Sequence, residues 1–219
     1  MEDLFHLAAR VADVADEQRP LRADAERNRQ AILCAATTIL SEQGTATTLE
    51  HIANVAGVGV GTIYRRFPTI DDLVAVVLEE KMTRYADRTE AAAERASVEP
   101  WEAFRDYVLF FLSEQAADLG FSDVILFGAN GAGTALFRSE IQRAFDASVT
   151  LVDRAKAAGA IRADFHHSDL LLLHHANAGL LRGTQSTAPT AWKRLGDYML
   201  QAFRMSDPEP LTSVPDAWQ

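Results

Sequence analysis

The chain has 219 residues and a net charge of −10, and 48% of its residues are hydrophobic while 24% are charged. These values fit a globular protein made of one compact domain, or of a small domain joined to a larger one. No apolar run approaches the roughly 20 residues of a membrane-spanning helix, and the single cysteine, Cys34, excludes an internal disulfide framework and a multi-cysteine metal site. Since the acidic N-terminus lacks the basic start of a secretory signal, we expect a cytoplasmic protein without membrane association.

Nearly all of the chain is predicted to be helical, because apolar residues recur at helical spacing and no run of alternating β-branched residues occurs. A weak helix is predicted over 3–17, and Pro20 separates it from the rest. A short apolar stretch covers 121–129, and the tail from Ser206 contains three prolines and is predicted to be flexible. The other helices are expected over 22–43, 48–55, 59–66, 70–85, 100–118, 134–157, 168–183 and 189–204.

Charge is unevenly distributed along this helical chain. Residues 19–69 contain six arginines and four acidic residues, a net charge of +2, so the remainder of the chain carries −12. A weakly basic N-terminal module on an acidic body can still bind phosphate groups through one face.

The stretch from Thr47 to Phe67 reads TTLEHIANVAGVGVGTIYRRF and predicts two short helices joined by a tight turn. Thr47 followed three residues later by Glu50 is a capping box that starts the first of them. Gly57 lies where the chain must turn sharply, and the second helix is expected to begin at Gly59. Two helices in this arrangement form a helix-turn-helix unit, whose second helix enters the major groove of DNA.

Side chains on that second helix suit a contact with nucleic acid. Gly59 and Gly61 would let the backbone approach DNA closely, and N–H groups at a helix N-terminus favour a phosphate. Thr62 can reach a base edge or a phosphate, and Tyr64 and Arg66 carry groups suited to phosphate oxygens. The alternative is that the same residues form an ordinary helical hairpin, in which the glycines serve the turn alone.

The wider pattern resembles the TetR family of bacterial regulators over about residues 22–85. The resemblance rests on matches at fixed spacing, namely Ile32, Ala36, Leu40, Gly44, Thr47, Ile52, Ala53, Ala56-Gly57-Val58, Gly61-Thr62-Ile63-Tyr64, Phe67 and Leu73. It implies a three-helix DNA-binding head, a larger helical body that binds a small ligand, and a homodimer on a palindromic operator. It also implies that Thr47, Thr48, Thr62, Tyr64 and Arg66 occupy DNA-contacting positions. With the neighbouring residues of the second helix, the predicted DNA-binding set also includes Gly59, Val60, Gly61 and Arg65.

Two positions depart from the family pattern, because Val60 and Ile70 stand where the family often has a basic residue. Phosphate binding would then depend on Arg65, Arg66 and the arginine-rich start of the first helix, which contains Arg22, Arg27 and Arg29. Val60 can instead contact a thymine methyl group.

The C-terminal part is rich in aromatic residues, which line an apolar cavity or simply pack the core. The candidate residues for binding a small apolar or amphipathic ligand are Phe104, Tyr107, Phe111, Phe127, Asn130, His174 and Asn177. Because adjacent histidines point about 100° apart on a helix, His174 and His175 do not easily share one metal, and no metal site is predicted.

The segment 170–181 reads LLLLHHANAGLL and is apolar on nearly all sides, as expected of a helix that is covered on both faces. One face would pack on the body and the other on a second subunit. The helix over 189–204 is its natural companion, so two helices from each subunit would form a four-helix dimer interface.

These observations predict an all-α fold, with a three-helix helix-turn-helix head and a larger helical ligand-binding and dimerisation body. The expected divisions are an N-terminal extension (1–21), the DNA-binding domain (22–68), the helical body (69–205) and a flexible tail (206–219). The predicted function is a repressor that a ligand releases from its palindromic operator. The alternatives are a DNA-binding regulator without ligand control, and an all-α cofactor-binding protein; since no catalytic motif is found, neither an enzyme nor a bound cofactor is predicted.

Overall fold

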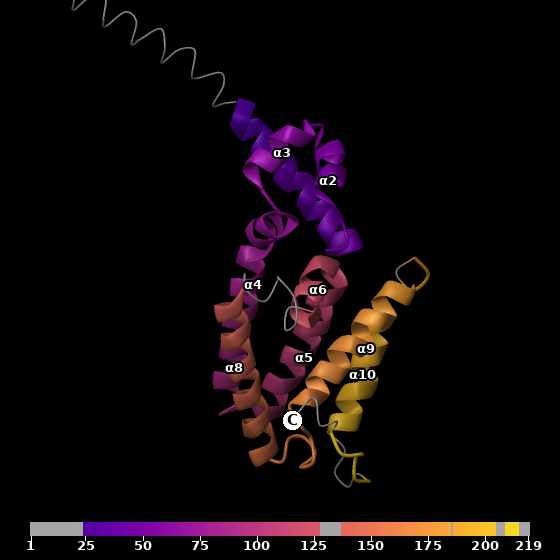
Figure 1. Cartoon of the computed structure of the whole chain (residues 1–219). Helices are drawn as coiled ribbons and strands as arrows, with labels where there is room; N and C mark the ends of the chain where they lie inside the picture. Colours follow the sequence, from indigo (N-terminus) through magenta and orange to yellow (C-terminus); the bar gives the residue numbers. More distant parts are fainter. Residues whose placement is uncertain (1–23, 128–136, 185, 205–208, 215–219) are drawn as a thin grey trace, which may run out of the picture.

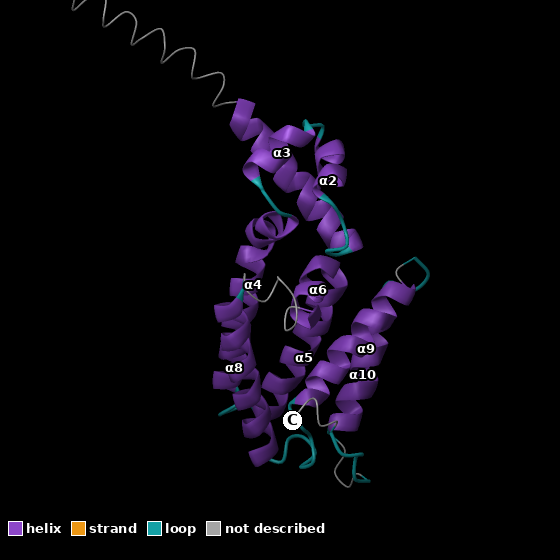
Figure 2. Cartoon of the chain, viewed as in Figure 1, coloured by secondary structure: helices purple, strands orange, loops and turns teal. Residues whose placement is uncertain are grey.

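A computed structural model describes residues 24–127, 137–184, 186–204 and 209–214. These residues form helices and connecting loops and no strand, so the predicted all-α class is confirmed (Figure 2). The first helix covers 24–43 and is followed by α2 (Leu49–Ala56), α3 (Val60–Arg66), α4 (Ile70–Arg95), α5 (Pro100–Ala117), α6 (Leu119–Phe127), α8 (Arg138–Ala157), α9 (Ser168–Thr184) and α10 (Ala191–Phe203).

The first helix, α2 and α3 form a small head at one end of a longer body that contains the other helices (Figure 1). The head has its own core, because one apolar face of each helix points inward. Its fully buried members include Ile32, Ala36, Ile52, Ala53 and Ile63.

The α2 helix begins one residue later than the sequence suggested. Thr48, not Thr47, is the N-cap residue, since its backbone is extended and its side chain accepts a hydrogen bond from the His51 N–H. This register turns Leu49, Ile52 and Ala53 toward the core. The predicted Thr47–Glu50 capping box is therefore wrong, because either of two adjacent threonines can cap the helix and burial of the apolar face selects the second.

Gly57 ends α2 in the left-handed conformation, with φ of 67°. Its N–H donates to Ala53 and Asn54 carbonyl oxygens, and the chain then reverses into α3. The predicted turn at Gly57 is confirmed.

The α4 helix joins head to body without interruption, and it runs ten residues further than the predicted end near residue 85. Its last turns lack an obvious apolar stripe, but Ala86, Thr89 and Ala93 are small enough to pack closely against neighbouring helices. Figure 1 shows α8 lying alongside α4. The Arg143 guanidinium on α8 bonds Asp87 and Glu90 of α4 at 2.6 and 2.7 Å, which fixes the register of the pair.

The body core contains a cluster of three aromatic side chains at the end remote from the head. Phe104, Phe165 and Phe203 meet edge to face, with ring centroids 4.9 to 6.1 Å apart. None of the described helices is long and apolar enough to cross a membrane.

Several predicted segments differ from the structure or fall outside it. Of the stretch predicted as short and apolar over 121–129, residues 121–127 belong to α6, which begins at Leu119, and the last two lie outside the described residues. The helix predicted over 3–17 lies outside the described residues. In the tail predicted to be flexible, the described residues 209–214 are tied to the body, because Arg162 donates to the Glu209 carbonyl and the Leu211 N–H donates to Asp164.

We predict that Gly57→Ala destabilises the protein by about 1–2 kcal/mol, because a β-carbon is unfavourable at this positive φ. Thermal unfolding followed by circular dichroism measures the change. Gly61→Ala is the matched control, since Gly61 lies inside α3 and an added β-carbon there meets nothing within 4 Å. Equal stability of the two variants would contradict the prediction.

Candidate DNA-binding surface and ligand cavity

One face of α3 is exposed, while the opposite face is anchored in the head. Ile63 is fully buried, and Phe67 follows at 5% exposure. On the outer side Val60 is 47% exposed and Tyr64 is 42% exposed, and Gly61 presents bare backbone between them. An α-helix held in this way can enter the major groove without disturbing the core behind it.

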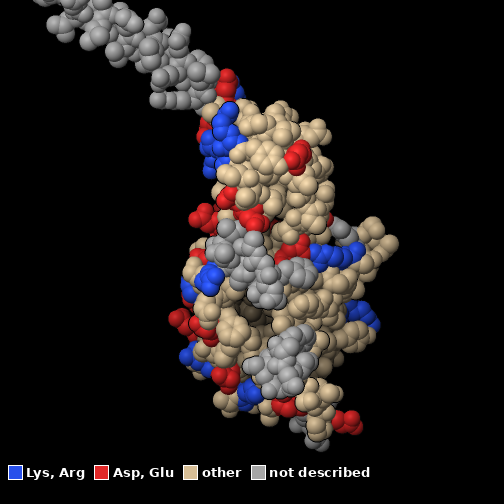
Figure 3. All heavy atoms as spheres, viewed as in Figure 1, with Lys and Arg blue, Asp and Glu red and all other residues tan. Residues whose placement is uncertain are grey.

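Arginines from two helices meet beside this face. A groove between the first helix and α3 is lined by Arg29, Thr62, Arg65 and Arg66, together with Ala25, Asn28 and Ile32. Figure 3 shows arginine atoms gathered on this side of the head, whereas the rest of its visible face is mostly uncharged. The groove brings together three of the five arginines that the sequence singled out. Arg27 instead pairs with Asp24 on its own helix, and Arg22 lies outside the described residues.

An acidic residue lies within the exposed face, which the sequence did not single out. The Tyr64 hydroxyl donates to Glu50 of α2 over 2.5 Å. This bond lowers the pKa of Glu50 and raises the pKa of Tyr64. The Tyr64 proton is therefore already engaged, and a negative charge stands beside the surface predicted to face DNA.

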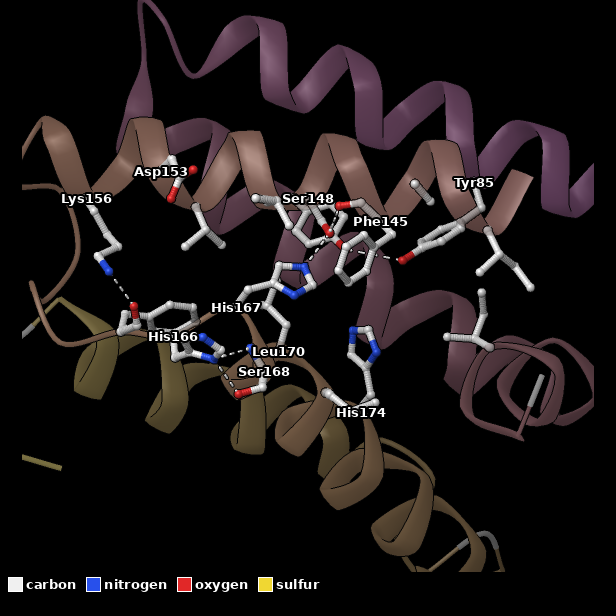
Figure 4. A pocket seen from close by; sticks show the side chains of 18 residues that line it. Tyr85, Phe145, Ser148, Asp153, Lys156, His166, His167, Ser168, Leu170 and His174 are labelled. Carbon is white, nitrogen blue, oxygen red and sulfur yellow. Dashed lines mark hydrogen bonds between the residues drawn. The ribbon is translucent and has the colours of Figure 1, made fainter. Parts of the chain in front are cut away.

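A cavity of about 690 Å³ lies within the body. Its walls come from α4, α5, α6, α8, α9 and the loop before α9, and most of the lining is apolar, including Ile125, Ile141, Val149, Val152 and Leu170. This volume is within the range of pockets that bind small molecules. Figure 4 shows Tyr85 toward one end of the cavity and Asp153 and Lys156 at the other.

Two hydrogen-bonded pairs of polar side chains line the cavity. The Tyr85 and Tyr107 hydroxyls lie 3.2 Å apart, and Ser148 Oγ is 2.6 Å from His167 Nε2. Ser148 Oγ also donates to the Phe145 carbonyl oxygen at 2.8 Å. Burial raises the pKa of Tyr107 to about 12 and raises that of Tyr85 well above its ordinary value, so both hydroxyls keep their protons.

His174 of α9 faces this space from below (Figure 4). Its ring is 8% exposed and stacks on Phe111 with centroids 3.3 Å apart. Its Nε2 finds no hydrogen-bond partner among the described residues. Burial, with the nearby His167 and His175, holds the pKa of His174 well below its ordinary value, so the ring is neutral.

The cavity includes two of the seven residues that the sequence proposed for a ligand, Tyr107 and His174. Phe104, Phe111 and Asn177 are not among its lining residues, which corrects that expectation. The two phenylalanines fill the core, and Asn177 is fully buried where it donates to Gln115 and to the Leu112 carbonyl. Phe127 ends α6, and Asn130 lies outside the described residues.

Sequence reasoning did not propose Tyr85, Ser148 or His167 for a ligand. Tyr85 and Ser148 stand on the buried faces of α4 and α8, and a polar residue on an otherwise apolar helix face was the signal that could have indicated them. Among the described residues, no cluster of three His, Cys, Asp or Glu side chains has an arrangement that could hold a metal ion.

A separate junction ties the head to the body. Asp123 of α6 is 6% exposed and accepts hydrogen bonds from the Thr45 N–H at 2.8 Å and from the Thr45 hydroxyl. Its other oxygen pairs with Arg182 of α9. The residue therefore connects the loop after the first helix with two helices of the body.

An apolar face remains exposed along α9 and α10, which lie side by side (Figure 1). Leu172 is 50% exposed and Tyr198 is 58% exposed. On α9, β-carbons added at Gly179 and Gly183 would meet nothing within 4 Å, so another helix could approach that backbone closely.

The buried histidines predict a pH dependence of stability. The pKa values of His174 and His167 are lowered in the folded protein, mainly by burial, so the unfolded chain binds more protons below its ordinary histidine pKa of about 6.5. The free energy of unfolding should therefore fall as the pH drops from 7 to 5, by at most about 1.4 kcal/mol per pH unit for each histidine. Urea unfolding at a series of pH values measures the slope.

His174→Phe and His174→Gln should both reduce this slope, because neither replacement takes up a proton. If both variants show the same reduced slope, the reduction comes from the lost proton uptake and not from altered packing, since Phe and Gln pack differently. A slope that is unchanged in both variants would contradict the assignment.

Two family models match the chain. The model "Bacterial regulatory proteins, tetR family" matches residues 32–77, and the model "Transcriptional regulator SbtR-like, C-terminal domain" matches residues 99–203. Among curated proteins, the HTH-type transcriptional regulator SAR0097 of Staphylococcus aureus (strain MRSA252) is 37% identical over 67 residues, which cover 30% of this chain and 35% of that relative.

Solved structures extend the similarity over most of the chain. The TetR transcriptional regulator SCO0520 from Streptomyces coelicolor is 32% identical, with a TM-score of 0.50, and the match covers 82% of this chain and 99% of that one. FadR from Bacillus subtilis, solved in complex with stearoyl-CoA, shares the fold at 17% identity, with a TM-score of 0.57 over 82% of this chain and 100% of that one. With a helix-turn-helix head, a larger helical body and a relative matched along its whole length, the chain belongs to the TetR family of bacterial regulatory proteins.

Proposed function

We propose that this protein is a homodimeric transcriptional repressor that binds a palindromic operator in the cytoplasm and is released by a small ligand. The observation that carries the DNA-binding part is the exposed face of α3 beside the groove lined by Arg29, Arg65 and Arg66. A helix presenting bare backbone, a hydroxyl group and guanidinium groups on one side has the chemistry to read a groove and hold the flanking phosphates.

Each predicted DNA-contacting residue has a definable role in this proposal. Val60 and Gly61 would face base edges, where an exposed valine can contact a thymine methyl group. Arg65 and Arg66 would hold phosphates, and Tyr64 would do so once its hydroxyl leaves Glu50. The remaining predicted contacts are the capping residues at the helix starts, Thr48 and Gly59, and the neighbouring threonines, Thr47 and Thr62.

The exposed apolar face of α9 and α10 supports a two-fold dimer. A second copy would cover Leu172 and Tyr198, and the open backbone at Gly179 and Gly183 would let two α9 helices pack closely. Such a dimer would present two α3 helices about one DNA turn apart, roughly 34 Å, which matches a palindromic site.

The cavity favours a regulator controlled by a ligand, rather than a DNA-binding regulator without ligand control. Tyr85 lines the cavity from α4, which begins three residues after α3 ends. Ile125 lines it from α6, which carries Asp123 at the junction with the head. A ligand that favours a different position of these helices would change the spacing of the two heads and lower operator affinity.

We predict opposite effects from two substitutions on the DNA-facing side. Arg65→Ala should weaken binding similarly across DNA sequences and lower the salt dependence of log K by about one. Glu50→Gln should strengthen binding by about threefold at low salt, because it removes a negative charge beside the phosphates and loosens its hold on Tyr64. Fluorescence anisotropy with palindromic DNA from the region upstream of the gene measures both at several salt concentrations.

Arg84→Ala is the control for the first variant, since Arg84 is an exposed arginine on α4 outside the head. It should leave the affinity and the salt dependence unchanged. If the unaltered protein held no palindrome from this region at low salt, the proposed function would be wrong.

A further prediction concerns the junction. Asp123→Ala should cost about 2 kcal/mol of stability and speed hydrogen exchange at the Thr45 amide, because it removes that amide's acceptor. Hydrogen-exchange mass spectrometry over the loop after the first helix measures the second effect. Glu79→Ala, at an exposed position of α4, should leave exchange there unchanged. Unaltered exchange in Asp123→Ala would show that the contact does not hold the head.

A further inference from the structure

The unpartnered nitrogen of His174 is the polar group that most needs a ligand. Its ring is more than nine-tenths buried, lines the cavity, and has Nε2 without a hydrogen-bond partner among the described residues. Leaving a buried polar atom unpaired is unfavourable, so such atoms usually have a partner from the protein, from ordered water or from a ligand. Stacking on Phe111 orients the ring. Because Nε2 has almost no accessible surface in this structure, a ligand would reach it through a small shift of the ring or its neighbours.

Several other polar side chains of the cavity already have hydrogen-bond partners. Tyr85 bonds Tyr107, Ser148 donates to the Phe145 carbonyl and pairs with His167, and Lys156 donates to the Phe165 carbonyl. Figure 4 shows the Tyr85 hydroxyl and the Ser148–His167 pair on the side of the cavity across from His174. The wall thus contains neutral hydrogen-bonding groups around a site where one partner is still required.

The charges of the cavity oppose a strongly ionised ligand. Lys156 and Asp153 are its charged lining residues within the described part of the chain, and they offset each other at one end. Arginine is absent from the described lining. The titratable groups that face His174 across the cavity are Tyr85, Tyr107 and His167, and all of them are neutral near pH 7 because burial opposes their charged forms. A carboxylate or phosphate near His174 would lack a compensating cation.

The type of polar group follows from the chemistry of a neutral imidazole. Nε2 is a donor in one tautomer and an acceptor in the other. A hydroxyl group serves both cases, since it can donate and accept, whereas a carbonyl serves one. The rest of the ligand must match walls that are mainly aliphatic and aromatic.

We infer that the effector of this regulator is an uncharged, mainly apolar molecule whose hydroxyl group binds His174 Nε2. The inference rests on the proposed ligand control and goes beyond it by naming the ligand class. It separates this cavity from a site for acyl-CoA compounds, whose phosphate groups carry several negative charges. Its volume of about 690 Å³ accommodates a molecule of two to four fused or linked rings.

A matched series of rigid probes tests the inference by isothermal titration of the full-length protein. Flavone, 4′-hydroxyflavone and flavone-4′-carboxylate share one ring system and differ at one position, and stearoyl-CoA supplies a multiply charged comparison. We expect 4′-hydroxyflavone to bind about tenfold more tightly than flavone, and the carboxylate and stearoyl-CoA to bind more weakly than 4′-hydroxyflavone.

Two variants assign the preference to His174. In His174→Phe the affinities for 4′-hydroxyflavone and flavone should become equal within about twofold, with flavone binding unchanged, because the stacked ring is kept and the nitrogen is lost. In His174→Gln, whose amide can donate and accept, a preference for the hydroxylated probe should persist. Circular dichroism melting verifies that each variant is folded.

The inference would be overturned if the carboxylate or stearoyl-CoA bound most tightly, if flavone and its hydroxylated form bound equally well to the unaltered protein, or if none of the flavones bound. Repeating the titrations with operator DNA present separates this result from the proposed function. If stearoyl-CoA released the DNA, the inferred ligand class would be wrong and the proposed repressor function would stand. If the protein bound 4′-hydroxyflavone but bound no DNA, the proposed repressor function would be wrong and the inferred ligand class would stand.

Discussion

The carboxylate of Asp123 determines how the two parts of this molecule are joined. One oxygen accepts from the Thr45 backbone and hydroxyl in the head, while the other pairs with Arg182 on α9. Because the carboxylate is almost fully buried, losing any partner would leave part of its charge uncompensated. The loop is shaped to reach it, since Gly44 has φ of 78° and an added β-carbon would collide with the Asp123 side chain.

The same junction connects the exposed apolar face of α9 and α10 to the helix-turn-helix head. The α9 helix supplies Arg182 to Asp123, His174 to the cavity and Leu172 to the exposed apolar face. Close packing of α6 on the head adds to the connection, as a β-carbon added at Gly120 would lie 3.1 Å from Leu40, which is tighter than an ordinary contact. A change in the position of α9 or α6 therefore acts directly on the loop that precedes α2.

The head could be predicted from sequence because its structure is local. Gly57, the capping threonines and the inward residues of two short helices lie within about twenty positions, and their spacing specifies the turn. The one-residue error at Thr47 arose where two adjacent threonines had equal capping chemistry and the buried face decided between them. Glu50 was not recognised as a partner of Tyr64, because fourteen residues separate them and their contact depends on the crossing of α2 and α3.

The presence of an apolar cavity could be predicted from the sequence, but most of the residues that line it could not. Aromatic residues were its visible signal, yet Phe104 and Phe111 fill the core, whereas the cavity is bordered by Tyr85, Ser148 and His167 from three separate elements. Which side of α5 and α8 faces a cavity depends on how these helices pack, and hydrophobic periodicity reports only that a side is buried. Asn177 illustrates the same limit, since its amide donates to Gln115 inside the core.

The uninterrupted α4 helix has a mechanical consequence. Tyr85 at the cavity is fifteen residues from Ile70 at the head, roughly 22 Å along the axis at 1.5 Å per residue. A tilt of roughly 5° about the Tyr85 end would move the Ile70 end by about 2 Å, given that length. The helix contains no glycine or proline to absorb the motion. Under the proposed ligand control, a displacement of a few tenths of an ångström beside the cavity would therefore become a larger displacement at the head.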